Sequence, residues 1–141
     1  CGSCWAFAAV GNIEGQLAIK NGGEVVSLSP QQLVDCDTVD KGCNGGLMEP
    51  AFKYIMSSGG IASEADYAYT GREDKCKFDV SKAVARVNGY NFAGTEDENE
   101  IREILHQTGP LAIAINASPL QFYFGGIFDP WFGFIRCSPY L

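Results

Sequence analysis

Cysteine is the residue type with the widest chemical capability in this sequence, which has 141 residues and six cysteines: Cys1, Cys4, Cys36, Cys43, Cys76 and Cys137. Cys1 and Cys4 have the Cys-x-x-Cys spacing of a redox dithiol or of one half of a zinc site. A zinc site needs a second close pair of ligands, and His106 is the sole histidine. The spacing therefore disfavours zinc, while a redox pair, structural disulfides and a reactive thiol stay open.

The overall composition excludes some classes of partner. The net charge of −7 argues against nucleic acid and anionic membranes as main partners. The sequence has no apolar run long enough for a membrane span and no signal-peptide pattern. Its length suits one domain or most of one. The number of cysteines favours an oxidising compartment.

The residues after Cys4 predict the element that would make this thiol reactive. Apolar residues recur at helical spacing from Trp5 to Leu17, which predicts a buried helix over about residues 4–20 with Ser3 as its N-cap. Gly11 and Gly15 suggest that something packs closely on this helix. The positive end of the helix dipole would favour a thiolate at Cys4, so we interpret Cys4 as a candidate nucleophile.

Two further helices are predicted in the first half of the chain. Ser29 caps a short helix that reaches Cys36, and Gln32 completes a capping box with Ser29. A third helix is expected over about residues 48–57 and ends at a glycine pair. Between them, Gly45 and Gly46 lie in a loop that something must approach closely.

The second half changes character near residue 84. The segment from there to about residue 93 reads as extended, and a capping box at Thr95–Glu98 opens a helix to about Gln107. Residues 111–116 form an apolar run of strand length and predict a buried strand. Helices followed mostly by strands indicate an α+β fold.

Several stretches together resemble the papain-like cysteine proteases, the cathepsins. The Cys1–Phe7 stretch, CGSCWAF, is similar to the active-site signature of that family. Further stretches match its landmarks in the same order: residues 12–16, 27–37, 42–48, 109–110 and 137–141. Some of them, CSPYL among them, are closest to the cathepsin F branch.

The resemblance implies an α+β, papain-like fold and a cysteine endopeptidase. Residues 1–85 would form a helical half, and residues 86–141 would begin an antiparallel β half that is truncated, so the chain is expected to be an internal piece of the mature domain. Cys4 would be the nucleophile, with its backbone N–H in the oxyanion hole. The catalytic His and Asn would lie beyond Leu141, and the 141 residues alone would be inactive. His106 matches no family motif and reads as an ordinary helix residue.

The resemblance also assigns the other cysteines and a substrate site. It implies disulfides between Cys1 and Cys43 and between Cys36 and Cys76, and a partner beyond Leu141 for Cys137. Substrate backbone would pair with Gly45 and Gly46. The main specificity pocket, S2, would be lined by Leu47, Met48 and Ala114, and would favour bulky apolar or aromatic residues over Arg.

The implied partners are peptide or protein substrates, the protein's own propeptide and cystatin-type inhibitors, with no cofactor, metal, nucleic acid or membrane. The implied location is lysosomal or secreted. Asn116 fits a glycosylation pattern that we expect to be unused. The alternatives are a non-catalytic papain-like homologue and the Cys-x-x-Cys redox protein.

Overall fold

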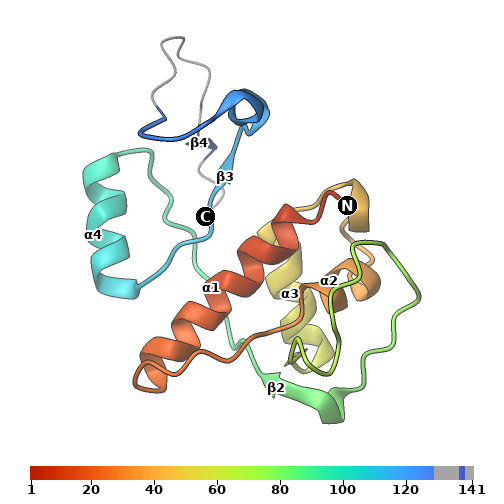
Figure 1. The fold of residues 1–141 in the computed structure, drawn as a ribbon. Helices are drawn as coiled ribbons and strands as arrows, with labels where there is room; N and C mark the ends of the chain where they lie inside the picture. Colours follow the sequence, from red (N-terminus) through yellow and green to blue (C-terminus); the bar gives the residue numbers. More distant parts are fainter. Residues whose placement is uncertain (129–136, 139–141) are drawn as a thin grey trace.

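A long helix, α1 (Cys4–Lys20), runs along one edge of the helical part of the molecule and carries the candidate nucleophile at its first residue (Figure 1). The computed structural model describes residues 1–128 and 137–138. Its helix matches the predicted bounds, and Asn21 and two glycines follow it. Five residues of α1 are buried: Trp5, Ala6, Ala9, Val10 and Ile13. They lie on the face that packs on α2 (Pro30–Cys36) and α3 (Met48–Ser58).

The two shorter helices also form where the sequence predicts them. Ser29 caps α2, because its Oγ accepts the backbone N–H of Gln32 at 3.0 Å. The reciprocal half of the expected capping box is absent: Gln32 Nε2 donates to Gly60 O at 3.1 Å and Gln32 Oε1 accepts the N–H of Ala62 at 2.8 Å. Gly59 follows α3 in the left-handed conformation that glycine favours.

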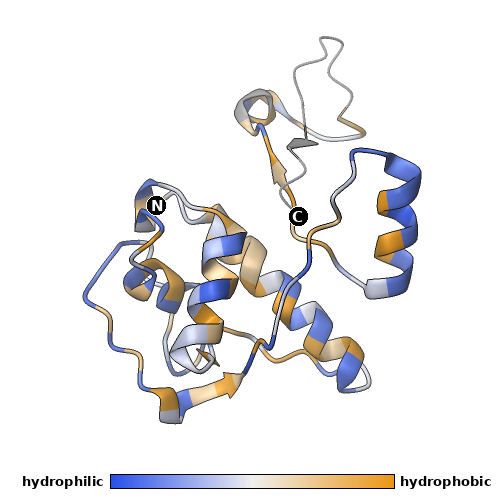
Figure 2. Cartoon of the chain, turned by 180° about the vertical axis from the view of Figure 1, so that it is seen from behind, coloured by the Kyte–Doolittle hydropathy of each residue, from blue (hydrophilic) through white to orange (hydrophobic). Residues whose placement is uncertain are grey.

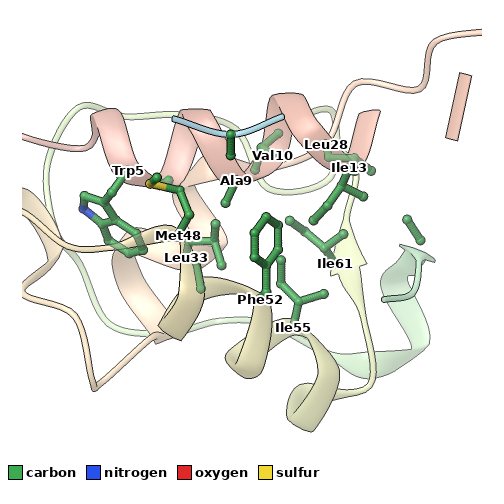
Figure 3. Packing of buried hydrophobic residues seen from close by; sticks show 14 of the residues in the cluster. Trp5, Ala9, Val10, Ile13, Leu28, Leu33, Met48, Phe52, Ile55 and Ile61 are labelled. Carbon is green, nitrogen blue, oxygen red and sulfur yellow. The ribbon is translucent and has the colours of Figure 1, made fainter. Parts of the chain in front are cut away.

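The core fills the space between the three helices (Figure 3). Trp5, Ala9, Val10 and Ile13 of α1 face Met48, Phe52 and Ile55 of α3, and Leu33 of α2 lies among them. Leu28 and Ile61 close the far end of this cluster. Burial of these apolar side chains is the main stabilising term for the helical part.

Two small antiparallel sheets complete the described part. β1 (Ile61–Ala62) pairs with β2 (Ala83–Ala85), with Ile61 opposite Ala85. β3 (Ala114–Ile115) pairs with β4 (Cys137–Ser138), with Ala114 opposite Ser138. The expected strand over 111–116 is therefore shorter than predicted, and it is not fully buried, because Ile113 and Ile115 are about half exposed. Within residues 1–128, three 3-10 turns join the larger elements: Gly42–Asn44, Val80–Lys82 and Ser118–Phe122.

The fourth helix, α4 (Glu98–Thr108), lies to one side of the helical part with β3 and β4 (Figure 1). It begins later than the Thr95 capping box predicts, because Asp97 is the cap and accepts the N–H of Asn99 at 2.8 Å. None of its residues is buried, and its ribbon is coloured mainly as hydrophilic residues (Figure 2). Within the described ranges, no helix is both long and apolar enough to span a membrane.

The segment after α4 is fastened to α1. Asn12 Nδ2 donates to Pro110 O at 2.6 Å, and Gln16 Nε2 donates to Thr108 O at 2.7 Å. A Cβ added at Gly15 would lie 2.5 Å from Pro110 Cγ, so the close packing predicted at Gly15 is present. At Gly11 it is absent, because a Cβ there meets nothing within 4 Å. The helical part with small antiparallel sheets is the α+β arrangement that the sequence predicts.

Candidate functional site

Cys4 is exposed at the first position of α1, between two buried residues. Ser3 is 3% exposed and Trp5 is 2% exposed, so the backbone on both sides of the thiol is fixed in the structure. Because Cys4 opens the helix, its own N–H has no partner within α1. Among the described side chains, Cys4 is the one cysteine outside a disulfide. A thiol and an unpaired N–H at a helix start suit nucleophilic attack with stabilisation of a developing anion.

The loop that follows α2 is attached to the residues on both sides of Cys4. A disulfide joins Cys1 to Cys43, and the N–H of Gly2 donates to Cys43 O at 2.7 Å. On the other side, Trp5 Nε1 donates to Gly42 O at 3.1 Å. The start of α1 and the 3-10 turn Gly42–Asn44 therefore form one unit. Since Cys1 is bonded to Cys43, Cys1 and Cys4 do not form a redox dithiol.

Ser3 occupies the N-cap position of α1, but its hydroxyl does not cap the helix. Its Oγ instead lies 2.6 Å from the hydroxyl oxygen of Tyr69. The Tyr69 ring also packs edge-on against Phe7, with 4.8 Å between ring centroids. Tyr69 therefore braces the first turn of α1 from a distant segment, which sequence reasoning did not predict.

The segment that carries Tyr69 is held by a second disulfide and by Asp35. The disulfide joins Cys36 to Cys76. Asp35 Oδ2 accepts the hydroxyl of Tyr67 at 2.8 Å, and Asp35 Oδ1 accepts the N–H of Asp74 at 2.8 Å. Burial, offset in part by the N–H of Lys77, raises the pKa of Tyr67 to about 12, so this hydroxyl keeps its proton. The two disulfides are the pairs that the resemblance implies.

Gly45 and Gly46 follow the 3-10 turn Gly42–Asn44 in an extended stretch. Gly45 has a φ of 109°, a value that favours glycine, and its carbonyl accepts the N–H of Lys41 at 3.0 Å. A Cβ at Gly46 would lie 2.6 Å from Trp5 Cδ2 and 2.7 Å from Asp40 Cγ. No other described residue hydrogen-bonds to the backbone of Gly46. This half-buried N–H and C=O can therefore pair with an extended peptide.

Two acidic residues that sequence reasoning missed support this stretch. Asp40 Oδ1 accepts the N–H of Leu47 at 2.9 Å, and Asp37 Oδ1 accepts the N–H of Val39 at 2.9 Å. The pKa of Asp40 is raised to about 6, mainly by burial. The hydrogen bond from the Leu47 N–H lowers this pKa, and the nearby Asp37 raises it. The sequence signal that could have indicated this pair is the Asp-x-x-Asp spacing of Asp37 and Asp40, just before the glycine-rich turn.

The residues assigned to the S2 pocket differ in their surroundings. Leu47 is 47% exposed beside Gly46, whereas Met48 is 5% exposed and belongs to the core. Ala114 is half-buried and packs against the same core cluster. Leu47 and Met48 lie at the start of α3, and Ala114 packs against the core cluster that contains Met48, but a pocket role for the three positions stays a prediction.

The remaining predicted positions lie elsewhere. His106 is exposed in the last turn of α4, which lies away from the Cys4 end of α1 in both views (Figures 1 and 2). Asn116 is exposed just after β3. Cys137 belongs to β4, and its side chain falls outside the described part, as do residues 139–141. Among the described residues, no group of three or more His, Cys, Asp or Glu side chains could hold a metal.

A cavity of about 660 Å³ opens beside the C-terminal half of α1, at the other end of the helix from this site. It lies between α1, residues 86–93 and residues 108–112, and Gln16, Phe52 and Tyr90 contribute to its lining. Its lining does not include Cys4 or the Gly45–Leu47 segment. The reactive groups therefore gather at the start of α1 and not in this cavity.

Comparison with known proteins identifies the relatives of this arrangement. The profile of a family described as "Papain family cysteine protease" matches residues 1–139. Over 140 residues the chain is 51% identical to cysteine proteinase 15A of Pisum sativum, covering 93% of this chain and 38% of that protein. It is 45% identical over 131 residues to cathepsin F of Drosophila melanogaster, covering 93% of this chain and 21% of that protein.

A solved structure gives the same result. Digestive procathepsin L2 proteinase from the larval midgut of Tenebrio molitor superposes with a TM-score of 0.87 at 41% identity. The match covers 93% of this chain and 42% of that chain. The chain therefore spans less than half the length of each of these relatives.

Proposed function

Because this chain belongs to the papain family of cysteine proteases, we propose that it acts, within the whole protein, as a cysteine endopeptidase with Cys4 as its nucleophile. The observation that carries this proposal is the exposed thiol at the first residue of α1, beside the glycine segment that can receive a peptide. The papain-family match over residues 1–139 supports the same reaction class.

In the proposed reaction, the thiolate of Cys4 attacks the carbonyl carbon of the scissile peptide bond. The positive end of α1 stabilises the thiolate before attack. The backbone N–H of Cys4 then donates to the oxyanion that forms on the carbonyl oxygen. The amine leaves with a proton, and a thioester on Cys4 is hydrolysed by water to regenerate the thiol. These proton transfers require a His and an Asn that orients it, which we expect, from the resemblance, to lie outside the 141 residues.

The substrate in this proposal is an extended peptide. Its backbone pairs with the N–H and C=O of Gly46, next to Gly45, as a strand pairs with a sheet edge. Leu47, Met48 and Ala114 line the pocket for the residue before the scissile residue, which we expect to be apolar or aromatic. No acidic residue is assigned to that pocket, so Arg is not expected there.

Partners and location follow from the same proposal. The structural neighbours include a procathepsin, and we propose that this protein also has a propeptide that covers its site. Cystatin-type inhibitors are proposed as further partners. The two disulfides support an oxidising location, either lysosomal or secreted.

The test replaces Cys4 in the full-length mature protein. With fluorogenic peptides, Cys4→Ala is expected to lower kcat by about a thousandfold or more, because the covalent step is lost. Ser57→Ala, an exposed change on α3, is the control and should keep full turnover. In the parent protein, iodoacetamide should alkylate Cys4 at the same rate at which turnover is lost. Turnover that survives in Cys4→Ala would refute the proposal.

A further inference from the structure

Asp37 and Asp40 form a carboxyl pair behind the glycine segment that the proposed reaction does not use. One oxygen of each is occupied: Asp37 Oδ1 by the N–H groups of Val39 and Asp40, and Asp40 Oδ1 by the N–H of Leu47. The other oxygen of each, Oδ2, is buried and has no partner among the described residues. Asp37 as a whole is 5% exposed. Buried polar atoms without partners are costly, so this pair needs an explanation.

A proton supplies the missing partner. The two residues are in direct contact, because the N–H of Asp40 donates to Asp37 Oδ1 at 3.4 Å, and their carboxyl groups interact. Two ionised carboxylates are both acceptors, so a bond between them requires that one be protonated. Carboxyl groups that share a buried site do not readily ionise together, because the second negative charge is repelled by the first. A metal is a poorer partner, since only these two acidic side chains of the described residues meet here.

We propose that Asp37 and Asp40 share one proton, and that this proton holds the Gly45–Leu47 segment in the position that receives substrate. Asp40 is then a positioning residue, acting through the backbone of Leu47 and through its contact with Gly46. This inference rests on the proposed function for the role of the segment. The sharing of the proton itself does not depend on peptide cleavage.

The contacts around Asp40 explain how its charge state reaches the substrate. Its Oδ1 holds the N–H of Leu47, and the space for a Cβ at Gly46 is occupied by Asp40 and Trp5. When both carboxyl groups are ionised, repulsion and loss of hydration favour movement of Asp40 toward water. Leu47 and Gly46 then have to shift with it, because no free space separates them from Asp40.

The other titratable groups near the pair do not neutralise it. Tyr54 of α3 interacts with the charge of Asp37, and the Glu73 carboxylate lies against Gly42. Neither side chain can supply a positive charge to the pair. Lys41, the adjacent cation, is exposed to solvent. Burial and Asp37 together raise the pKa of Asp40 to about 6, which places the change between mildly acidic and neutral pH.

The first test follows the segment directly. In a full-length Cys4→Ser protein, which does not digest itself, the backbone amide NMR signals of Gly45, Gly46 and Leu47 are recorded from pH 4.5 to 7.5. We expect them to titrate together with a midpoint near pH 6. In Asp40→Asn the side-chain amide donates permanently to Asp37, and this titration should disappear. In Asp37→Asn the carboxyl of Asp40 still titrates, but the new amide can donate to it, so the midpoint should fall below that of the parent protein.

The control is Asp79→Asn, which alters an exposed carboxyl that accepts the N–H of Ser81 and lies outside the site. It should leave the titration of the glycine segment unchanged. A titration that persists in Asp40→Asn would overturn the inference, as would an unchanged midpoint in Asp37→Asn or the absence of the titration from the parent protein.

The second test measures peptide affinity in the same Cys4→Ser background. If the ionised pair does not hold the segment for binding, the apparent Kd should be about tenfold weaker at pH 7 than at pH 5, because about one molecule in eleven remains competent. Asp40→Asn should bind with the same Kd at both pH values. An equal pH dependence in the two proteins would overturn the positioning role. Peptides that bind at neither pH would instead refute the proposed function. In that case the amide titration would still show whether Asp37 and Asp40 share a proton.

Discussion

The hydroxyl groups of Ser3 and Tyr69 lie 2.6 Å apart and join residues that are 66 positions apart in the sequence. Ser3 immediately precedes the candidate nucleophile, Cys4. The contact connects the start of α1 to the segment fastened by the Cys36–Cys76 disulfide. The orientation of the first turn of α1 therefore depends on a residue far outside the signature that contains Cys4.

Tyr69→Phe removes this hydrogen bond and keeps the ring that packs on Phe7. The Ser3 hydroxyl is buried and is left without its partner, so the free energy of unfolding should fall by about 1–2 kcal/mol. The measurement is urea unfolding of the full-length Cys4→Ser protein. Tyr123→Phe is the matched control, because it removes an exposed hydrogen bond to Gly126 O and should change stability by much less. Equal losses in the two variants would contradict the bracing role of Tyr69.

Gly15→Ala tests the close contact between α1 and Pro110. The added Cβ would lie 2.5 Å from Pro110 Cγ, so the helix or the following segment has to move. We expect a loss of about 1–3 kcal/mol, the usual cost of overpacking, measured by thermal or urea unfolding. The hydrogen bonds from Asn12 and Gln16 to residues 110 and 108 should weaken with it.

Gly11→Ala is the control within the same helix. Nothing lies within 4 Å of a Cβ at Gly11, so alanine should raise stability by about 0.5–1 kcal/mol through its higher helix propensity. A stabilising Gly15→Ala would show that Pro110 moves away without cost.

The raised pKa of Asp40 gives a defined pH dependence of stability. Its pKa is about 6 in the folded protein against an ordinary value of 3.8, so the folded state holds the proton more tightly. The stabilisation from this proton is complete below pH 3.8 and is lost as the pH rises through about 6. As the pH rises from 3.8 to about 6, the parent loses this stabilisation and Asp40→Asn does not. The free energy of unfolding of Asp40→Asn should therefore increase relative to that of the parent over this range, as measured by urea unfolding.

The stability difference between Asp74→Asn and its parent should change with pH in the opposite direction. The N–H of Lys75, together with the charge of Lys77, holds the pKa of Asp74 below its ordinary value. The stabilisation by this carboxylate is present above its ordinary pKa and is lost as the pH falls through the lowered value. The variant should be less stable than its parent at neutral pH, with the difference shrinking in acid. Parallel curves for the two Asn variants would contradict both assignments.

The helices of the first half could be predicted because their signals are local. The apolar spacing from Trp5 to Leu17 and the Ser29-Pro30 start depend only on neighbouring residues. The capping side chains could not be predicted in the same way. Ser3 and Gln32 each have distant partners, Tyr69 and Ala62, that satisfy their polar groups better than the local backbone does. The 111–116 strand was predicted too long because its neighbour covers two residues of it.

Within the candidate site, the thiol and the two glycines could be predicted, because each belongs to a contiguous stretch of the sequence. The Asp37–Asp40 pair was not found, because acidic residues in a loop are usually solvated and only the fold buries these two. The proximity of Cys4 to the Gly45–Leu47 segment likewise depends on contacts between residues about 40 positions apart, such as Gly2 with Cys43.

The bond between Cys1 and Cys43 has a consequence for proteolytic nicking. A cut in the exposed turn at residues 21–24, between α1 and α2, would divide the polypeptide into two pieces. The Cys4 helix and the Gly45–Leu47 segment would lie on different pieces, yet the disulfide would still join them. A nicked protein would therefore gain one water in mass but keep both parts of its site together until a reductant separated the pieces.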